Sequence, residues 1–280
     1  MLTEITPLIL TFNEAPNIER TLEQLDWATQ IIVVDSGSDD ATIDILQRYP
    51  QVKVFHRRFD THANQWNFGL EQVRLAQSAT AQRSGWVLSL DADYVVTDEL
   101  IAEIKALSSD RAIDGYFLKF KYCVFGKPLR GTLLPPRLAL FRHDKAVYID
   151  DGHTQLLQLN GNAETLTAYL HHDDRKPLSR WLWAQDRYML IEVKKLRETP
   201  AHELSLGDRI RQQKLLAPLI ILIYCLILKG GIFDGWQGWY YAFQRVLAEL
   251  LLSIRLIESE YCDRCLTAQS KAPTSKFLSL

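Results

Sequence analysis

Apolar runs that end in acidic or amide side chains recur through the first hundred residues, and they constrain the fold most. Three such runs read "PLILTFNE" (7–14), "IIVVD" (31–35) and "WVLSLDAD" (86–93). Helical patterns fall between and after these runs, at about 18–25, 40–48, 64–80 and 98–107. This order of strand and helix patterns predicts a mostly parallel sheet with helices on both faces.

The acidic ends of these runs are candidates for a binding site, because ligands of open parallel sheets lie beyond the carboxyl ends of the strands. An isolated Asp91-Ala92-Asp93 would favour a simple turn, since Asp is common in turns. Three acidic or amide strand ends at one edge of a sheet favour a site instead. Asp91 and Asp93 project to the same side of an extended segment, and their carboxylates suit Mg²⁺ or Mn²⁺.

Two common nucleotide motifs are absent from the sequence. It contains neither GxxxxGK[ST] nor GxGxxG. This argues against phosphoryl transfer by a P-loop and against hydride transfer on a dinucleotide-binding fold.

The pattern changes after the first hundred residues. Strand-like segments from 115 to 172 predict a mixed-sheet half of the same domain, and a helix is predicted over 178–198. The run "LLAPLIILIYCLIL" (215–228) is apolar for 14 residues, fewer than the roughly 20 of an ordinary membrane span. A buried helical hairpin is one interpretation. The Gly-Gly break and the Trp and Tyr cluster that follow favour helices lying in a membrane interface over 215–258.

The charge of the chain is unevenly distributed. Residues 1–174 hold 16 basic and 24 acidic side chains, a net charge of −8, whereas residues 175–280 hold 16 and 10, a net charge of +6. A basic, Trp- and Leu-rich last third suggests an anionic membrane surface rather than nucleic acid as partner. A merely solvated basic face is the alternative.

The N-terminus and the cysteines bear on the compartment. "MLTEITPLIL" has no positively charged start, so no signal peptide is expected. Four cysteines fit a reducing compartment. Cys262 and Cys265 form a lone pair without further ligands at zinc spacing, and we interpret the pair as incidental.

Taken together in their order, these motifs resemble the inverting family-2 glycosyltransferases. "LILTFNEAPNI" is similar to the family's first strand and Asn-Glu turn, "IIVVDSGSDDAT" to its nucleotide-binding element, and "WVLSLDADYVV" to its DxD strand. "HANQWNFGLEQV" (62–73) resembles the helix before that strand in enzymes of the lipopolysaccharide-core type. The resemblance covers about residues 5–175 and continues more loosely through "LKGGIFDGWQGWYYAF".

The resemblance implies the GT-A fold, a Rossmann-like, mostly parallel mixed sheet with helices on both faces, followed by amphipathic helices. It implies a glycosyltransferase domain over 1–175, with a nucleotide-binding half (1–110) and an acceptor and metal half (111–175). Residues 176–280 would form a helical, membrane-apposed region. The nucleotide-sugar site would consist of strand-end and helix residues, namely Thr11, Asn13, Glu14, Asp35, Ser36, Asn67 and Asp91.

Individual roles follow from the same resemblance. Asp35 would accept a hydrogen bond from the base, such as the imide N–H of uracil. Asp91 would contact the ribose or a Mn²⁺ or Mg²⁺ ion, and Asp93 would bind that ion directly. An inverting transfer needs one general base, for which "YIDDGHTQLL" (148–157) offers Asp151 or Asp150.

Histidines are further candidates on the acceptor side. His153 suits a metal ligand or a phosphate contact, although Gly152 beside it also marks a plain turn. The run from His171 to Asp174 could reach the site, but an ordinary polar loop is the preferred interpretation.

The sequence departs from the family pattern at three places. Tyr94 follows the DxD where many core-type relatives have an acid, and Gly152-His153-Thr154 replaces a Val-His-Glu motif. The QxxRW motif of processive synthases is absent, because Pro177 stands at the Gln position before Arg180-Trp181. This favours the transfer of a single sugar.

We therefore expect a metal-dependent inverting glycosyltransferase that moves one sugar from a nucleotide-diphosphate donor, UDP-linked, to a lipid-linked or lipopolysaccharide-core saccharide. It would lie in the cytoplasm, peripherally on the inner face of the membrane, with oligomerisation possible. The alternatives are a GT-A-like module that binds a nucleotide sugar or glycan without turnover, and a sugar nucleotidyltransferase. The sugar, the acceptor and the oligomeric state are left open.

Overall fold

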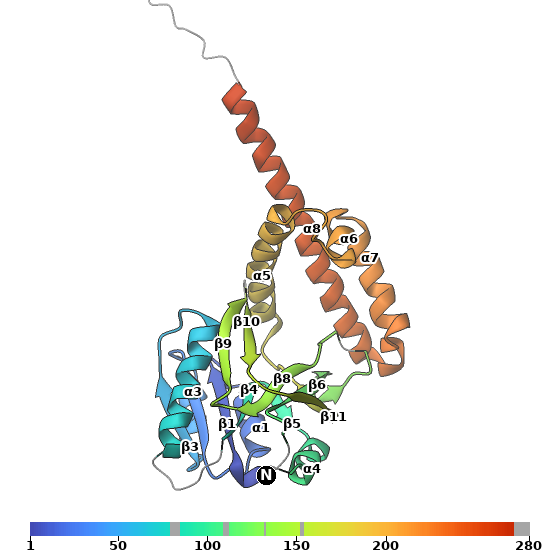
Figure 1. Ribbon diagram of the computed structural model, residues 1–280. Helices are drawn as coiled ribbons and strands as arrows, with labels where there is room; N and C mark the ends of the chain where they lie inside the picture. Colours follow the sequence, from blue (N-terminus) through green and yellow to red (C-terminus); the bar gives the residue numbers. More distant parts are fainter. Residues whose placement is uncertain (79–84, 109–111, 132, 152–153, 272–280) are drawn as a thin grey trace, which may run out of the picture. The chain divides into compact units, whose positions relative to one another are not determined.

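A computed structural model describes residues 1–78, 85–108, 112–131, 133–151 and 154–271 (Figure 1). The chain divides into two compact units, Met1–Pro177 and Leu178–Leu280. Each unit is described by itself.

The first unit is built around one large sheet. In the described part of the chain this sheet has nine strands, in the order β3-β2-β1-β4-β8-β6-β11-β5, with β7 paired to β6. These strands are β1 (Ile5–Thr11), β2 (Ile31–Asp35), β3 (Val52–His56), β4 (Trp86–Asp91), β5 (Tyr94–Val96), β6 (Gly115–Val124), β7 (Lys127–Pro128), β8 (Arg137–Arg142) and β11 (Ala163–His172). Strands β3, β2, β1 and β4 are parallel, whereas β8 is antiparallel to both of its neighbours. The predicted change from a parallel to a mixed half is thus confirmed.

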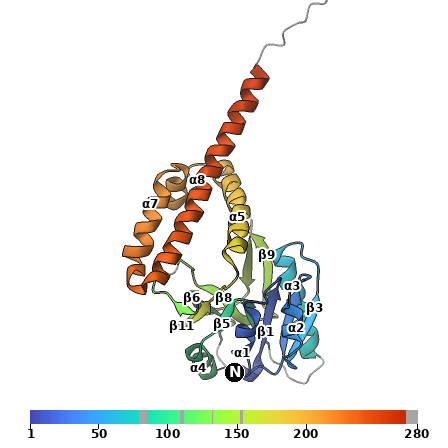
Figure 2. The ribbon, with the colours of Figure 1, turned by 180° about the vertical axis from the view of Figure 1, so that it is seen from behind.

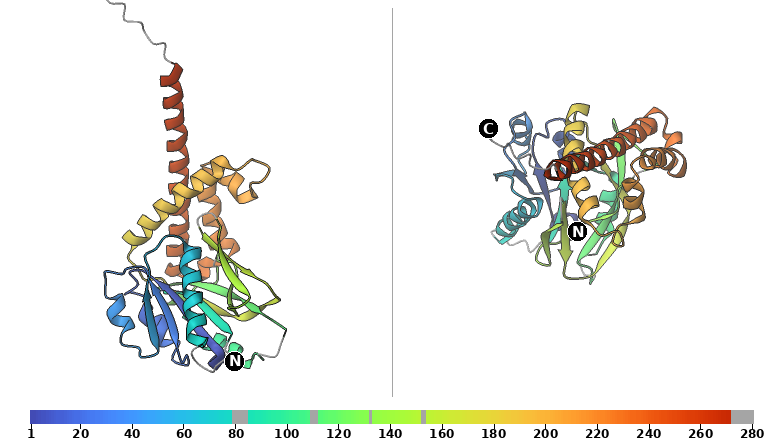
Figure 3. Two further views of the ribbon diagram at one scale, coloured as in Figure 1. Left: turned by 60° about the vertical axis from the view of Figure 1, so that its left-hand side comes forward. Right: turned by 90° about the horizontal axis from the view of Figure 1, so that it is seen from above.

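Helices cover both faces of the parallel half, as predicted. A short 3₁₀ turn, η1 (Leu2–Glu4), precedes β1, and the helices of this unit are α1 (Ile18–Glu23), α2 (Thr42–Leu46), α3 (His62–Ser78) and α4 (Asp98–Ala106). Alternate residues of a strand point to opposite faces. Accordingly, Ile9 packs in one core cluster with residues of α1, α2 and α4, and Leu8 packs in another with residues of α3. Figure 3 shows the ribbon of the sheet and its helices from two further directions. A Cβ on Gly69 of α3 would come within 2.6 Å of the Leu8 side chain, so glycine permits this close approach.

A two-stranded hairpin lies apart from the large sheet. Strands β9 (Ala146–Asp151) and β10 (Thr154–Leu159) pair only with each other in the described chain. The hairpin packs on α3, where the Tyr148 ring stacks on Trp66 with centroids 5.3 Å apart. Gly152 and His153, between the two strands, lie outside the described residues.

The second unit is helical (Figure 2). Its elements are α5 (Leu178–Glu198), α6 (Leu206–Gln212), α7 (Leu216–Ile223), the π-helical turn η2 (Tyr224–Leu228), the 3₁₀ turn η3 (Gly231–Asp234) and α8 (Trp236–Lys271). Helix α5 covers the helix predicted over 178–198, and α8 contacts α5, α6 and α7. Arg211 of α6 forms an ion pair with the buried Glu249 of α8 at 2.8 Å.

The predicted amphipathic segment exposes many apolar side chains. Within the described residues, no helix is long and apolar enough to cross a membrane. The exposed apolar side chains of α7 and of the turns after it include Leu216, Leu219, Ile220, Ile223, Ile227, Leu228, Ile232 and Phe233. Those of α8 repeat every three or four residues, at Trp236, Trp239, Phe243, Leu247, Leu250, Ile254 and Ile257. Their contact with a membrane stays a prediction.

Candidate active site

The ends of three parallel strands meet at one edge of the sheet. Strand β1 lies between β2 and β4, so that Thr11 pairs with Asp35 and Leu10 pairs with Asp91. The strand order β3-β2-β1-β4 changes direction at this point, which is where ligands of open α/β sheets bind. The convergence expected from the three sequence motifs is therefore present.

Asp35 shapes the loop that follows β2. Its side chain is buried, and one carboxylate oxygen accepts hydrogen bonds from Gly37 N at 2.8 Å and from Ser38 N at 2.9 Å. The other oxygen accepts from the Ser38 hydroxyl and, at 3.5 Å, from that of Thr11. The proposed contact between Asp35 and a nucleotide base stays a prediction, and it would add to these bonds.

Asn13 joins the loop after β1 to the loop after β2. Its amide donates to Asp39 Oδ1 at 2.7 Å and accepts from Asp39 N at 2.9 Å. Its own N–H donates to Ser38 Oγ at 2.9 Å. Asn13 has a φ of 55°, in the left-handed region that Asn tolerates better than most residues. The two loops are thus held in a fixed relation at this edge of the sheet.

Two further residues that were predicted to bind the nucleotide, Ser36 and Asn67, take part in hydrogen bonds with α3 and with strand β9 of the hairpin. Ser36 Oγ accepts from the fully buried Gln65 of α3 at 3.0 Å. Asn67 donates to the carbonyl oxygen of Tyr148 at 2.8 Å and accepts from its N–H at 2.9 Å. Asn67 therefore fastens α3 to β9, and its role toward a nucleotide stays a prediction.

Asp93 and His172 form the centre of the site. Asp93 is only 9% exposed, and its Oδ2 lies 3.1 Å from Nε2 of His172. Burial opposes the charge of each group, but their mutual attraction wins: it lowers the pKa of Asp93 and raises the pKa of His172. Oδ1 of Asp93 is buried and has no hydrogen-bond partner among the described residues. An unpaired buried carboxylate oxygen is costly, and a bound cation would satisfy it.

His172 ends β11, which lies within the strand-like segments expected from 115 to 172, but its place in the site was not anticipated. The preference for a polar loop over residues 171–174 is wrong for His171 and His172, which end β11 and pair with β5. Strand β11 lies between β6 and β5. The strand-like pattern "TAYLHH" followed by charged residues was the signal, since it repeats the pattern of the first three strands.

Tyr94 forms a wall of the site beside this pair. Its ring lies 5.1 Å from that of Phe120 and 5.3 Å from that of His172. Burial, with the nearby Asp91 that its hydroxyl bonds, holds the pKa of Tyr94 well above its ordinary value. The hydroxyl also accepts from Arg137 at 3.4 Å. A neutral phenol thus stands where many relatives have an acid.

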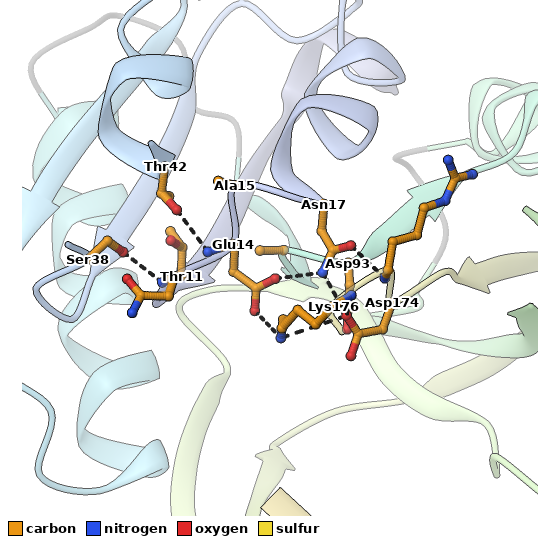
Figure 4. Close-up of polar contacts among 12 residues, drawn as sticks. Thr11, Glu14, Ala15, Asn17, Ser38, Thr42, Asp93, Asp174 and Lys176 are labelled. Atoms are coloured by element: carbon orange, nitrogen blue, oxygen red, sulfur yellow. Dashed lines mark hydrogen bonds and ion pairs between the residues drawn. The ribbon is translucent and has the colours of Figure 1, made fainter. Parts of the chain in front are cut away.

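Residues 173–176, which we call the strap, follow β11 and bind the loop after β1 (Figure 4). Asn17, only 1% exposed, donates to Glu14 Oε2 and to Asp174 Oδ1, both at 2.8 Å, and accepts from Arg175 N at 2.8 Å. Lys176 Nζ lies 2.7 Å from Glu14 Oε1. Asn17 and Lys176 were not among the predicted site residues, although Asn17 falls within the stretch "LILTFNEAPNI".

Glu14 is an unusually weak acid in this setting. Its burial raises the pKa to about 7, with a smaller contribution from the charge of Asp93 and against the opposing effect of Lys176. Glu14 N donates to Thr42 Oγ1 at 2.8 Å, which fixes the loop on its other side. Glu14 therefore changes its charge near neutral pH within the site.

The predicted general bases lie on the hairpin. Asp150 is exposed on β9, opposite Gln155 of β10. Asp151 is the last residue of β9, and its side chain, like the whole of His153, lies outside the described residues. The assignment of a base to Asp150 or Asp151, and of a metal contact to His153, stays a prediction.

The residues present fit a divalent cation that is bound partly by the protein and partly by oxygen atoms of a substrate. In the part of the chain that the structure describes, no group of three or more His, Cys, Asp and Glu side chains is placed so that it could hold a metal ion by itself. Asp93 offers its unpartnered Oδ1. His172 offers Nδ1, which is also buried without a hydrogen-bond partner among the described residues, when the ring is neutral and donates its Nε2–H to Asp93; Asp91 lies nearby. Mg²⁺ sites with few protein ligands and several phosphate or water oxygens are common.

Residues 8–156 match the family model described as glycosyl transferase family 2. An uncharacterized glycosyltransferase of Rickettsia bellii is 31% identical over 114 residues, which are 40% of this chain and 35% of that protein. The lipopolysaccharide core biosynthesis glycosyltransferase LpsC of Rhizobium meliloti is 26% identical over 113 residues, 38% of each chain. The chain thus spans little more than a third of the length of these relatives.

Solved structures with related folds have low sequence identity to this chain. S. aureus TarS 1–349 has 15% identity and a TM-score of 0.44, covering 88% of this chain and 80% of that one. Glucosyl-3-phosphoglycerate synthase from Mycobacterium tuberculosis, in complex with Mn²⁺, UDP and glucosyl-3-phosphoglycerate, has 14% identity and a TM-score of 0.41, covering 63% and 74%. Because the family model matches more than half of the residues, the chain belongs to glycosyl transferase family 2, as the sequence motifs predicted.

Proposed function

We propose that this chain is a metal-dependent inverting glycosyltransferase that moves one sugar from a nucleotide-diphosphate donor to a saccharide acceptor. The observation that carries the proposal is the Asp93–His172 pair, with an unpartnered carboxylate oxygen, where β4 and β11 end. Family membership supplies the class of reaction.

Asp93 and His172 would hold a Mn²⁺ or Mg²⁺ ion, with Asp91 beside them. Such an ion, when bound, neutralises the charge of a diphosphate leaving group. The acidic residue in direct contact with the ion has to be ionised, and the lowered pKa of Asp93 provides this at neutral pH. Thr11, Asn13, Glu14, Asp35 and Ser36 would form the side that receives the nucleoside.

In the transfer step, a carboxylate removes the proton of the acceptor hydroxyl. The acceptor oxygen forms a bond to the anomeric carbon while the bond from that carbon to the diphosphate breaks, and the nucleoside diphosphate leaves. We assign the base to Asp151 or Asp150, whose strand β9 is attached to α3 through Asn67. Attack opposite to the leaving group inverts the anomeric configuration.

A UDP-sugar donor and a lipid-linked or lipopolysaccharide-core acceptor are the finer parts of the proposal. The core-type motifs and the partial similarity to LpsC support this acceptor class. The exposed apolar side chains of α7, η2, η3 and α8 support binding to the inner face of the cytoplasmic membrane, where such an acceptor would be found. Self-association through the same side chains is the competing use of this surface.

The proposal is tested by donor hydrolysis and sugar transfer with Mn²⁺, comparing the wild-type chain with Asp93→Asn. We expect a loss of at least 100-fold in kcat/KM, of the order seen when a group that stabilises developing charge is removed. Asp144→Asn, an exposed carboxylate in the turn after β8, is the matched control and is expected to retain full activity. Full activity of Asp93→Asn would refute the metal role, and nucleotide binding without any turnover would favour the non-catalytic alternative.

A further inference from the structure

Lys176 is a half-hidden cation in the middle of the acidic site. Its side chain is 17% exposed, and its ammonium lies 2.7 Å from Glu14 Oε1. Asp174 Oδ1 lies 3.9 Å from the same ammonium, beyond hydrogen-bond distance. An ammonium has three N–H donors, and in the described chain Glu14 takes one of them. Lys176 therefore retains donors for a ligand while a part of its side chain is open to solvent.

The acceptors of Lys176 are fixed by a third residue. Asn17 donates one hydrogen bond to Glu14 Oε2 and one to Asp174 Oδ1. Each carboxylate thus has one oxygen held by Asn17, and Glu14 presents its other oxygen to Lys176. This arrangement holds the ammonium at the carboxyl end of β1 and uses only one of its donors among the described residues.

Lys176 also lies next to the candidate cation site. Figure 4 shows Lys176 and Asp93 side by side below the loop after β1, and the charge of each affects the other. Oδ1 of Asp93 is buried and lacks a partner among the described residues. A cation held there and the Lys176 ammonium would offer positive charge to a single polyanion from two directions.

We infer that Lys176 binds the diphosphate of the donor directly, exchanging its hydrogen bond to Glu14 for one to a phosphate oxygen. The inference rests on the proposed function and assigns a residue of the strap to its donor site. Lysine suits this role because it presents a compact charge with several donors to phosphate oxygens. As the leaving group gains negative charge, the same contact would become stronger, and Asn17 is the positioning residue that keeps Lys176 in place.

The alternative is that the Glu14–Lys176 ion pair only fastens the strap. The two possibilities differ in what they predict for ligands with and without phosphate. If the contact is direct, replacing Lys176 weakens the binding of UDP and inorganic pyrophosphate but not that of uridine. If the contact is purely structural, the replacement weakens the binding of all three ligands, because it changes the shape of the site.

The experiment is isothermal titration of the full-length chain with UDP, inorganic pyrophosphate and uridine, in Mn²⁺ and separately in EDTA. We expect Lys176→Met to weaken UDP and pyrophosphate on the order of 10- to 100-fold, in both conditions, as for a lost charge-assisted hydrogen bond. Uridine binding should not change, and Lys176→Arg should restore most of the loss. Lys145→Met, which breaks an ion pair of the same 2.7 Å length with Asp114 outside the site, is the matched control and should leave all three ligands unaffected.

A second variant, Glu14→Gln, should change the affinity for pyrophosphate in the opposite direction to Lys176→Met. Glu14→Gln removes the carboxylate that competes for Lys176, so it should tighten pyrophosphate binding by a few-fold. If the wild-type chain binds UDP but Lys176→Met binds it equally well, or loses uridine to the same extent, the inference is overturned and the proposed function is not. If the wild-type chain binds none of UDP, GDP, CDP and ADP with Mn²⁺, the proposed function fails and the inference fails with it.

Discussion

Replacing Asn17 with alanine should destabilise the first unit substantially, although this residue was not among the predicted site residues. Asn17 is only 1% exposed. It donates to Glu14 and Asp174 at 2.8 Å, and it accepts from Arg175 N at 2.8 Å and from the guanidinium of Arg20 at 3.0 Å. Three of these four partners are charged groups, to which a hydrogen bond contributes about 1.5–3 kcal/mol, compared with about 1 kcal/mol for a neutral one.

The expected loss is smaller than the sum of these bonds, because Glu14 keeps Lys176 and the side chains of Asp174 and Arg20 are partly exposed to water. We expect Asn17→Ala to lower the free energy of unfolding of this unit by about 3 kcal/mol. Asn64→Ala, at an exposed position with a side-chain bond to Asp60 at 3.1 Å, is the matched control, with an expected loss of about 0.5 kcal/mol.

The assay is hydrogen exchange in increasing urea, followed by mass spectrometry of peptides from β1 and β11, so that the two units are measured separately. Asn17→Asp is an informative companion variant, because it retains the shape but places a third carboxylate against Glu14 and Asp174. That carboxyl would have a raised pKa, so its cost should grow as the pH rises from 5 to 8. A loss for Asn17→Ala no larger than for Asn64→Ala would refute the reasoning.

Three other perturbations have distinct expected results. The pKa of Asp93 is lowered and that of His172 is raised, so their pair stabilises the fold fully between the ordinary pKa values of 3.8 and 6.5. At lower pH the contribution to stability decreases because Asp93 is protonated. At higher pH it decreases because His172 loses its proton. The difference in unfolding free energy between wild type and His172→Gln should therefore be largest near pH 5 to 6, and a difference independent of pH would contradict the ion pair. Tyr94→Phe retains the ring packing but loses the hydroxyl, so urea denaturation should show a loss of about 1 kcal/mol, and no loss would contradict the hydroxyl's role. Phe233, in η3, is 72% exposed, and Phe233→Glu should reduce flotation with anionic liposomes at least tenfold. The control Leu75→Glu, in the first unit, should not reduce it. If both variants float as well as the wild-type chain, membrane binding through this turn is refuted.

The parallel half of the sheet and its acidic edge could be predicted from the sequence because their signals are local. Runs such as "IIVVD" are apolar throughout, as expected of strands covered on both faces. Their carboxyl ends must meet at one edge if the strands are parallel, so Asp35 and Asp91 could be placed beside Thr11 before any coordinates were known.

The second half of the site depends on contacts between residues far apart in the chain. His172 reaches Asp93 across 79 positions, and Asn17 reaches Asp174 across 157. These contacts require β11 to lie between β6 and β5, an order that no local pattern specifies. The charged run after β11 was therefore interpreted as a polar loop, although it binds the loop after β1.

Side-chain roles inferred from a family pattern are also less secure than strand positions. Asn67 was predicted to contact a nucleotide, and both parts of its amide bond the main chain of Tyr148. Tyr94 stands where the family pattern has an acid. Its ring packs against the rings of Phe120 and His172, which explains why an aromatic side chain fits this position. Packing against residues of other strands decides such roles.

The central claim is that Asp93 holds a divalent cation together with the donor diphosphate. Isothermal titration of UDP in Mn²⁺ and in EDTA tests it most directly, with the wild-type chain and Asp93→Asn measured side by side. We predict that Mn²⁺ tightens UDP binding at least tenfold for wild type and leaves the affinity of Asp93→Asn unchanged. An equal effect of Mn²⁺ on both proteins would contradict the account.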